Sequence, residues 1–445
     1  MREHRHEVAG TPVVIRVVEN EDDLDGFRDF IRSNLRGLGV DSETTGLDIY
    51  SDTFSLRLAQ FGTDKEAWVV PAEKGERFRE DIRMALRGLQ KMTLHNAAYD
   101  LQVFDRTLDV PMEELWPKVT DTQILAHLVD PRGREEGGIG NKLEELTKHY
   151  IDPEVAENVK TLMKDLAREY KTTKAKIWKL VDIDNPRYEL YAGMDPILAC
   201  RMEQKLRPKV PGPSAHLIPY EHQIAEVCST MSRTGFLLDV EYSEKLSERL
   251  LEERDHWNAI AKTFGCENVN STEQVADVIE ARGHKIKGRT ETGKRKVDKV
   301  LLDQMVAQED EFAKAVVEAK RAGKWRKTWV ETFLSQRDAQ DRCHANINPL
   351  RARTARMSIT GIPAQTLPSG DWMVRRCFIA DEGHLMSSVD YQAQELRVLA
   401  ALSGDPTMRK AFLEGADLHQ MTADSAAVNR KVGKMANFLV VYGGG

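Results

Sequence analysis

The stretch LGVDSETTGLDIYSDTFSLRLAQFG, residues 38–62, contains two runs of alternating apolar and polar residues, joined by a segment rich in Thr, Ser, Asp and Gly. Such alternation is typical of a β-strand, and the intervening segment is typical of a turn. Two β-branched runs, TPVVIRVV at 11–18 and AWVVPA at 67–72, add further strands. Helical periodicity follows in residues 91–131, so the N-terminal part is predicted to be an α/β domain with a central sheet.

The middle of the chain is predicted to be mainly helical. RPKVPGPS at 207–214 holds three prolines in eight residues and is the best candidate for a linker. The periodicity of residues 241–264 predicts one long helix, and residues 300–335 predict a second long element that breaks at Gly323. Beyond Asp341 the chain becomes richer in Pro, Gly and short strand-like runs, and it then returns to helical patterns.

The composition excludes several classes of protein. The 445 residues carry a net charge of −7, no run of apolar residues is long enough to predict a membrane span, and the charged start MREHRHEVAG is not a secretory signal. The five cysteines are scattered without a CxxC pair, which indicates reduced thiols in a cytoplasmic protein. Basic residues cluster at 320–329 and 351–357, and net charge is a poor guide to such local grooves.

Acidic residues recur in three separate segments of the predicted α/β domain. Asp41 and Glu43 lie two apart on a predicted strand, which places both carboxylates on one face. Asp100 lies at the opening of a predicted helix, and Tyr191 and Asp195 lie at i and i+4 of another. Alone, these residues have ordinary explanations: a solvated strand end, a core aromatic, a helix-breaking residue before proline. Together they indicate a cation site, because neighbouring carboxylates repel unless a cation or proton lies between them.

The chemistry that needs four carboxylates is the hydrolysis of phosphodiester bonds by two metal ions. Two divalent ions roughly 3.5–4 Å apart activate a water and stabilise the leaving oxygen. Hard cations such as Mg²⁺ and Mn²⁺ prefer carboxylate oxygens. A tyrosine hydroxyl beside such a site can orient the attacking water.

Residues 35–205 resemble the DEDD-type 3′–5′ exonuclease family, in its tyrosine-bearing subclass. VDSETTGLD, HNAAYDLQVF and YAGMD are similar to its three motifs, in the same order. The resemblance implies a ribonuclease-H-like domain, two Mg²⁺ (or Mn²⁺) ions, and a water positioned by Tyr191. The metal ligands that it implies are Asp41, Glu43, Asp100 and Asp195. Asp121, in TDTQILAHLVDP, is usually structural in this family and is not expected to be catalytic.

Two patterns near the C-terminus are compatible with a nucleotide site, although each taken alone is more typical of an ordinary structural element. HLMSSVDY at 384–391 predicts a strand that ends at Asp390, where a metal ligand can be held firmly; the alternative is an N-cap for the helix that follows. Arg430, Lys434 and Phe438 lie at i, i+4 and i+8 of a predicted helix and share a face. Two cations and an aromatic ring suit a nucleoside triphosphate, although an isolated helix of this kind is more often an amphipathic surface helix.

These C-terminal segments are similar to the family A DNA polymerases, of the bacterial DNA polymerase I type. DYQAQELRVLAALSGD resembles the palm motif A, RKVGKMANFLVVYG resembles motif B of the fingers, and RARTARMSITGIPAQTLP resembles a segment that contacts primer–template. MSRTGFLLDVEYSEKL and KWRKTWVETF resemble the start and the tip of the thumb. The resemblance implies an exonuclease domain at 1–206, a mostly helical thumb-like region at 207–345, and an incomplete α+β palm and fingers region at 346–445.

The polymerase resemblance also implies roles for individual residues. Asp390 would bind the catalytic metals, and Glu395 would act as a steric gate against a ribose 2′-hydroxyl. The residues implied to bind the incoming dNTP are Glu395, His419, Arg430, Lys434, Phe438, Tyr442 and Arg375. The residues implied to contact DNA are Arg356, Gln365, Lys324, Arg326 and Lys327. The expected partners are therefore primer–template DNA, single-stranded 3′ ends and dNTP, with no membrane.

The chain departs from the family pattern in both polymerase motifs. Gln392, Ala393 and Gln394 stand where motif A normally has Ser, Gln and Ile, so a residue that helps to read the minor groove is missing. Ala355 replaces a Gly in the primer–template segment, and Leu439 replaces the usual Gly after the motif B phenylalanine. These departures predict a divergent relative from a virus of bacteria, which would place the protein in the host cytoplasm.

Polymerase catalysis in this family needs a second palm carboxylate, in a His-Asp-Glu motif beyond motif B. The sequence contains no HDE, and one carboxylate cannot hold two metals. We therefore expect that this chain alone does not polymerise DNA, and that a second polypeptide or the continuation of an interrupted gene supplies the rest. The alternatives are a stand-alone 3′–5′ exonuclease with a degenerate polymerase region that binds DNA, and a non-catalytic DNA-binding subunit, which the intact carboxylate set opposes.

Overall fold

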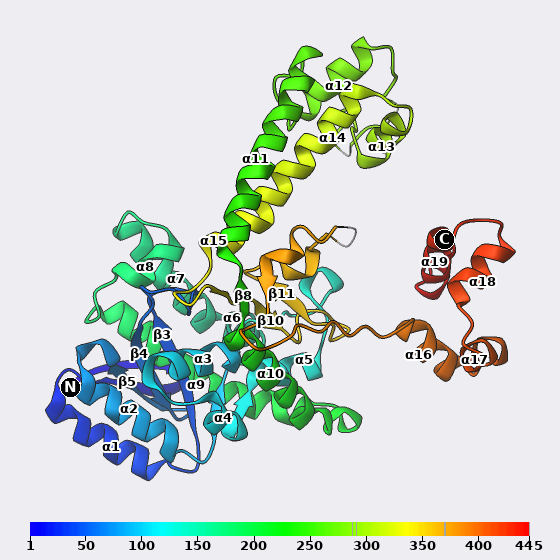
Figure 1. Ribbon diagram of the computed structural model, residues 1–445. Helices are drawn as coiled ribbons and strands as arrows, with labels where there is room; N and C mark the ends of the chain where they lie inside the picture. The colour runs from blue at the N-terminus through cyan, green and yellow to red at the C-terminus, as the bar shows by residue number, and fades with distance from the viewer. Residues whose placement is uncertain (287, 291, 369–370, 445) are drawn as a thin grey trace. The chain divides into compact units, whose positions relative to one another are not determined.

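The computed structural model describes residues 1–286, 288–290, 292–368 and 371–444 and divides the chain into two compact units, Met1–Asp381 and Glu382–Gly445 (Figure 1). No helix among the described residues is long and apolar enough to cross a membrane. The predicted α/β architecture is confirmed, since the first unit contains a seven-stranded mixed sheet with helices on both faces. The boundaries predicted for the three regions stay predictions.

The sheet has the strand order β1-β2-β5-β4-β3-β6-β7. Its strands are β1 (Arg2–Val8), β2 (Thr11–Val17), β3 (Leu38–Thr44), β4 (Leu56–Gly62), β5 (Glu66–Pro71), β6 (Met92–Leu94) and β7 (Val119–Asp121). β3 lies at the centre, antiparallel to β4 and parallel to β6. Strand β1 was not predicted, because its sequence REHRHEV is charged; it forms by antiparallel pairing with β2 across a turn at Ala9 and Gly10.

Two hydrophobic cores lie on opposite faces of this sheet. On β5, Trp68 and Val70 point into one core, while Ala67 and Val69 point into the other. The first core is covered by α1 (Leu24–Ser33), α2 (Glu76–Gly88) and α3 (Ala97–Leu108). The second is covered by α7 (Pro153–Glu169), α8 (Lys174–Leu180) and α9 (Pro186–Leu206). The shorter helices of this part are α4 (Met112–Leu115), α5 (Thr122–Val129) and α6 (Leu143–Tyr150).

Helix α9 packs unusually close to the central strand. A Cβ atom added to Gly39 of β3 would lie 2.2 Å from the carbonyl oxygen of Pro196, an approach that no side chain permits. Glycine at this position therefore allows the backbones of helix and strand to touch, and the contact lies next to Asp195.

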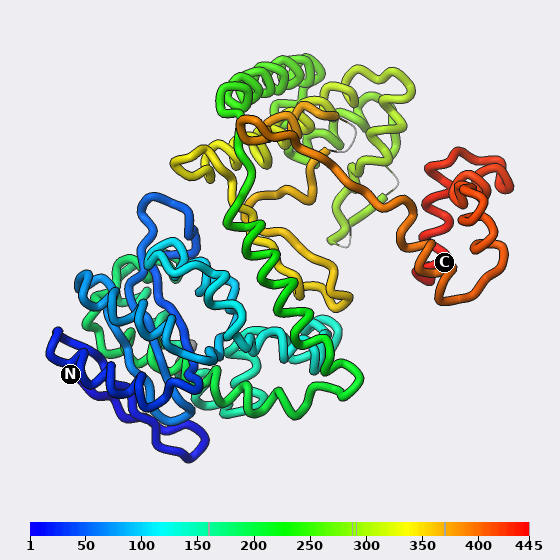
Figure 2. The backbone as a smooth tube through the Cα atoms, turned by 60° about the horizontal axis from the view of Figure 1, so that its bottom comes forward, coloured from blue at the N-terminus to red at the C-terminus, as the bar shows by residue number. Residues whose placement is uncertain are grey.

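A long helical hairpin follows the sheet. Two 3₁₀ turns, Arg207–Lys209 and Gly212–Ser214, connect α9 to α10 (Leu217–Thr234). The hairpin consists of α11 (Val240–Thr263), which confirms the predicted long helix, and α14 (Glu311–Lys324), and α12 (Thr272–Ala281) and α13 (Lys299–Ala307) lie at its far end (Figures 1 and 2).

The predicted helix break at Gly323 is wrong. The second long element is interrupted earlier, between α13 and α14, where Glu309 has a positive φ of 60° and Asp310 caps the new helix by accepting a hydrogen bond from the amide of Ala313. At Gly323 the helix continues into a π-helical turn, Trp325–Val330, and then into α15 (Glu331–Ser335). The helix accommodates Gly323 because an isolated glycine costs only about 1 kcal/mol relative to alanine.

Short strands connect the hairpin to the rest of the first unit. β8 (Phe236–Leu238) pairs with β9 (Arg342–Cys343) and β12 (Phe378–Ile379), and β10 (Asn346–Asn348) pairs with β11 (Ser358–Thr360). The second unit is helical, with α16 (Gln394–Ser403), α17 (Pro406–Leu413), α18 (Leu418–Ser425) and α19 (Arg430–Val441).

The strand predicted at 384–391 is wrong. Residues 384–393 adopt neither helix nor strand, and the side chain of Leu385 is 97% exposed. A strand is stabilised by a hydrogen-bonded neighbour, and among the described residues none pairs with this segment. A strand-like sequence is therefore not sufficient here to form a strand.

The close packing of α9 generates a stability prediction. We expect Gly39→Ala to destabilise the protein by about 1–3 kcal/mol, the usual cost of overpacking, because the new methyl group collides with the backbone at Pro196. Denaturant unfolding followed by circular dichroism measures the difference. Gly46→Ala is the matched control, since a Cβ there meets no atom within 4 Å; equal stability of the two variants would contradict the packing argument.

Candidate functional site

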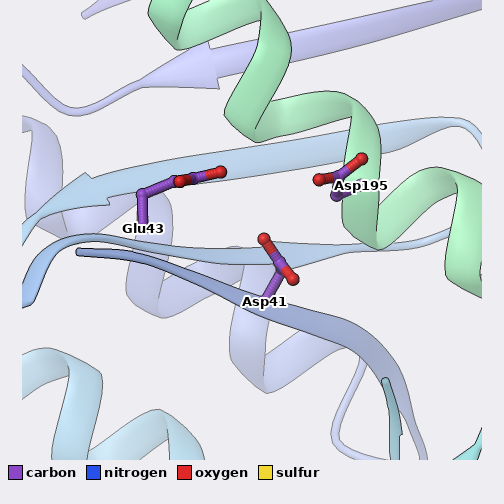
Figure 3. A group of neighbouring side chains, drawn as sticks. All are labelled: Asp41, Glu43 and Asp195. Atoms are coloured by element: carbon purple, nitrogen blue, oxygen red, sulfur yellow. The ribbon is translucent and has the colours of Figure 1, made fainter. Parts of the chain in front are cut away.

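Three carboxylates meet where α9 crosses the central strand (Figure 3). Asp41 and Glu43 come from alternate positions of β3, and Asp195 comes from α9. One carboxylate oxygen from each lies within 4.8 Å of the others. The spacing of two in the strand was predicted to place Asp41 and Glu43 on one face, and the structure confirms this juxtaposition.

The electrostatics of this group are unfavourable in the absence of a cation. Burial raises the pKa of Asp41 well above its usual value, and the charges of Asp100, Asp195 and Glu43 raise it further. Burial also raises the pKa of Glu43, with Asp195 and Asp100 adding to the effect and the Arg57 guanidinium opposing it. Burial raises the pKa of Asp195 to about 7. A bound cation would therefore relieve both the repulsion and the cost of burial.

Asp100 lies beside this group but not within it. It is the fourth residue of α3, and its carboxylate accepts a hydrogen bond of 2.6 Å from the hydroxyl of Ser42, between the two acidic residues of β3. Burial raises its pKa to about 7, while the Ser42 hydrogen bond opposes the shift. The structure thus brings together three of the four predicted metal ligands and holds the fourth against the same strand.

Tyr191 lies one helical turn before Asp195 and lines a cavity of about 110 Å³ with it. Burial raises the pKa of Tyr191, and the neighbouring carboxylates raise it further, so the phenol stays protonated at neutral pH. The ring of Trp178, from α8, packs 5.5 Å from the ring of Tyr191. The cavity is lined also by Leu143, Thr147, Ala156, Met163, Lys174 and Leu198.

The donor set fits divalent metal ions. Carboxylate oxygens without nitrogen or sulfur ligands are typical of sites for hard cations. Gln60 lies directly opposite Asp41 in the ladder of β3 and β4, so both side chains leave the sheet on one face. The Gln60 amide is fully buried, and no described atom hydrogen-bonds its nitrogen or oxygen. A buried amide without hydrogen-bond partners is unusual, and a bound ion with its waters would supply such partners.

Asp121 is structural, as expected. Its carboxylate accepts hydrogen bonds from the backbone amides of Asn96 and Ala97, at the start of α3, and of Gln123, at the start of α5. It thereby fixes the end of β6 and the helix that carries Asp100.

Five of the residues predicted to bind nucleotide gather on α18 and α19 of the second unit. The ring of Phe438 lies 5.5 Å from His419 and 6.2 Å from Tyr442, and the Lys434 ammonium lies 5.8 Å from its centre. Arg430 donates a hydrogen bond of 2.6 Å to Asp417. Burial lowers the pKa of His419, whose Nδ1 lies 3.1 Å from the Asn437 amide nitrogen. The shared helical face predicted for α19 is confirmed in these contacts.

Asp390 and Glu395 belong to the first part of the second unit. Asp390 is exposed in the extended segment before α16 and lines an open depression with Tyr391 and Arg397. The alternative of an N-cap is also wrong, because α16 begins after Ala393, which has a positive φ of 51°. Glu395 is in the first turn of that helix.

The residues predicted to touch DNA at the duplex lie in the first unit. Arg356 lies in the loop between β10 and β11. The Gln365 amide donates to the carbonyl of Met357, at 2.9 Å, and accepts from the amide of Ile359, so it secures this loop. Arg375, predicted to lie near the nucleotide, begins a 3₁₀ turn and donates to the carbonyl of Pro368.

The expectation that KWRKTWVETF forms the tip of the thumb is wrong. Trp329 packs with Leu238 and Ile362 in the core at the base of the hairpin, and its indole nitrogen donates to the Thr366 hydroxyl. Lys324, Arg326 and Lys327 therefore lie at the base. The tip instead carries the basic segment between α12 and α13, whose described residues are 282–286, 288–290 and 292–298. The sequence reasoning missed it, although its run of Lys and Arg was visible.

Comparison with known proteins assigns both parts of the chain. Residues 15–211 match the family model described as 3′–5′ exonuclease, and residues 240–445 match the one described as DNA polymerase family A. The DNA polymerase of Mycobacterium phage L5 is 61% identical over the whole of this chain, which covers 75% of that protein. The chain belongs to the family A DNA polymerases. The predicted exonuclease–polymerase resemblance is thus confirmed.

Two further proteins are similar to this family A polymerase. The DNA polymerase of Mycobacterium phage D29 is 56% identical, over the whole of this chain and 76% of that protein. The POL domain of Pol1 from M. smegmatis, in complex with DNA primer-template and dNTP, matches with a TM-score of 0.68 and 20% identity over 96% of this chain and 71% of that one. At that identity the likeness establishes the fold. Families of both kinds generally use divalent metal ions, and the carboxylate cluster is present in this chain.

The charge repulsion in the polymerase's carboxylate cluster generates a second stability prediction. In the presence of EDTA we expect Asp41→Asn to raise the free energy of unfolding by about 0.5–2 kcal/mol, because it removes one of the mutually repelling buried charges. Addition of Mn²⁺ should stabilise the unmodified protein and have a smaller effect on the variant.

Thermal unfolding with and without the ion measures both effects. Asp52→Asn, an exposed change in the loop after the same strand, is the control and should respond to Mn²⁺ as the unmodified protein does. Destabilisation by Asp41→Asn in EDTA would contradict the repulsion argument.

Proposed function

We propose that Asp41, Glu43, Asp100 and Asp195 hold two divalent ions, Mg²⁺ or Mn²⁺, and that this site hydrolyses the terminal phosphodiester bond at the 3′ end of DNA. The observation that carries the proposal is the meeting of three carboxylates from β3 and α9. When bound, the ions supply a more acidic water and charge stabilisation at the scissile phosphate.

The other residues of the site would orient and exclude water. The Tyr191 phenol, held protonated by its surroundings, would donate a hydrogen bond to the oxygen of the attacking water. Ser42 would keep Asp100 aimed along β3 through its short hydrogen bond. Leu143, Met163 and Leu198 form the apolar part of the adjacent cavity's lining and would limit access of bulk water to the reacting phosphate on that side.

The nuclease proposal predicts a large loss of activity from a single carboxylate. Asp41→Ala should remove about 3–5 kcal/mol of transition-state stabilisation, which corresponds to a loss of roughly two to four powers of ten in rate. The assay is the stepwise shortening of a 5′-labelled single-stranded oligonucleotide in Mg²⁺. Asp52→Asn is again the control, and unchanged digestion by Asp41→Ala would refute the assignment.

For the polymerase part, we propose that the α18–α19 residues bind the incoming dNTP. Arg430, Lys434 and His419 would contact the triphosphate, Phe438 its sugar, and Tyr442 would stack near the template base; Glu395 would exclude a 2′-hydroxyl. This proposal is supported by the clustering of aromatic and cationic groups around Phe438. Arg375 is a further candidate for the nucleotide.

We also propose that the partners of the chain are primer–template DNA and single-stranded 3′ ends. Arg356 and Gln365 would contact the duplex, with Lys324, Arg326 and Lys327 at the base of the hairpin and the basic segment between α12 and α13 at its tip. DNA affinity should then fall with salt, since contacts to phosphate release counterions. A location in the host cytoplasm stays a prediction. The alternative of a stand-alone exonuclease is not favoured, because the phage relatives that match the whole chain are DNA polymerases.

Nucleotide addition would need a second carboxylate beside Asp390. Among the described residues, the group of three or more carboxylates that lie close enough to hold one metal ion is Asp41, Glu43 and Asp195, and Asp390 is not part of it. We therefore propose that a ligand outside the described residues, on a second polypeptide, completes this site.

A primer-extension assay tests this requirement. We expect the 445-residue chain, with Mg²⁺ and all four dNTPs, to extend a primer poorly, and extension to appear when a polypeptide from the unmatched part of the phage L5 relative is added. Asp390→Asn should abolish the restored extension while leaving nuclease activity intact, because Asp390 is not in the nuclease carboxylate group. Robust extension by the chain alone would contradict the proposal.

A further inference from the structure

An irregularity in the sheet places a buried arginine behind the nuclease site. The register of β3 and β4 passes from Glu43 opposite Leu58 to Thr44 opposite Leu56, so Arg57 is the extra residue of a β-bulge. Bulges re-aim a side chain and are frequent beside active sites. This bulge begins at Glu43, one of the three clustered carboxylates, and it leaves the Arg57 side chain buried.

The Arg57 guanidinium connects three elements. Its Nε and Nη2 donate to the two carboxylate oxygens of Glu73, at 2.8 and 3.1 Å, which is the bidentate geometry that suits a guanidinium. Its Nη1 donates to the backbone carbonyl of Trp178, in α8, at 2.8 Å. Its Cζ lies 5.4 Å from the ring centre of Tyr188, in α9.

One of these contacts connects Arg57 to Tyr191, the residue proposed to orient the attacking water. The Trp178 carbonyl that Arg57 holds belongs to the residue whose ring packs against Tyr191 at 5.5 Å. Helix α8 is seven residues long, and Trp178 also packs against the second hydrophobic core, whose residue Ile177 precedes it. The hydrogen bond from the guanidinium adds a polar contact that fixes the backbone of Trp178 at the wall of the cavity that Tyr191 lines.

We propose that Arg57 is a positioning residue for the exonuclease reaction, which acts by holding Trp178 against Tyr191 and thereby aligning the tyrosine hydroxyl with the attacking water. The inference rests on the proposed nuclease function and goes beyond it, because Arg57 touches neither substrate nor reacting atoms. A lysine could not replace it, since one ammonium cannot donate to both Glu73 oxygens and to the Trp178 carbonyl in the same planar geometry.

The test is a double-mutant cycle between Arg57 and Tyr191. On a 5′-labelled single-stranded oligonucleotide with Mg²⁺, we expect Arg57→Met to lower kcat by roughly 10- to 100-fold, as misplacement of a catalytic group does, with KM little changed. In a Tyr191→Phe background the same substitution should cost less than about 3-fold, because the hydroxyl that it misplaces is already absent. Arg57→Lys should resemble Arg57→Met.

Controls separate positioning from general instability. Arg16→Met, on β2, removes another arginine that is paired with a glutamate of the same sheet, Glu66, and packed on Trp68; it should leave kcat within about 2-fold in both backgrounds. Binding of the same oligonucleotide in EDTA, measured by fluorescence anisotropy, should be unchanged in every Arg57 variant. Where Arg57→Met fails to fold, Arg57→Lys carries the cycle.

The outcomes are distinct. A loss of equal size in the Tyr191→Phe and unmodified backgrounds would overturn the inference, as would a full rescue by lysine. Failure of the proposed function shows itself separately, because Asp41→Ala would then leave digestion unchanged. A coupled loss in kcat with normal oligonucleotide binding supports the inference.

Discussion

The contact between α9 and β3 is the constraint on which the nuclease site depends. Gly39 lets the carbonyl of Pro196 touch the strand, and no larger residue fits there. Because Asp195 precedes Pro196 and Asp41 lies two residues after Gly39, the same contact that closes the core also brings their carboxylates together. The site is therefore a by-product of backbone packing, and its geometry is as fixed as the core itself.

This arrangement has an electrostatic cost, which the rest of the fold must offset. Burial and mutual repulsion raise the pKa values of the clustered acids, and the structure offers only partial compensation, from the Ser42 hydroxyl to Asp100 and from the Arg57 charge near Glu43. The cores on both faces of the sheet stabilise the domain enough to hold these groups together. A site that is strained when empty and relieved by a cation is preorganised for metal binding.

Part of this was predictable from the sequence. The two-residue spacing of Asp41 and Glu43 and the four-residue spacing of Tyr191 and Asp195 depend only on local periodicity, which sequence patterns reveal. Other features depend on what lies next to a segment in space. Strand β1 is charged and forms only by pairing with β2, whereas 384–391 has a strand-like pattern but no partner among the described residues.

The orientation of the hairpin and the register of the strands also cannot be predicted from sequence periodicity. Helical patterns predicted the hairpin but not which end carries KWRKTWVETF, which the packing of Trp329 decides. The bulge that re-aims Arg57 comes from a shift in pairing between β3 and β4, and no residue in either strand signals it alone. Sequence reasoning therefore found the clustered carboxylates and missed the buried arginine behind them.

In both units a glycine allows two backbone segments to pack closely, but the surroundings of the two contacts differ. In the second unit Gly433 of α19 lies so close to α18 that a Cβ would meet the carbonyl oxygen of His419 at 2.5 Å, so this pair also approaches through a glycine. Its surroundings differ, because Leu402, Leu413 and Val440 are largely exposed, whereas the nuclease site lies between two buried cores. Exposed apolar side chains gain stability from whatever covers them. The carboxylate cluster is thus supported within its own domain, while the helices proposed to bind the nucleotide would gain rigidity from further protein or from substrate.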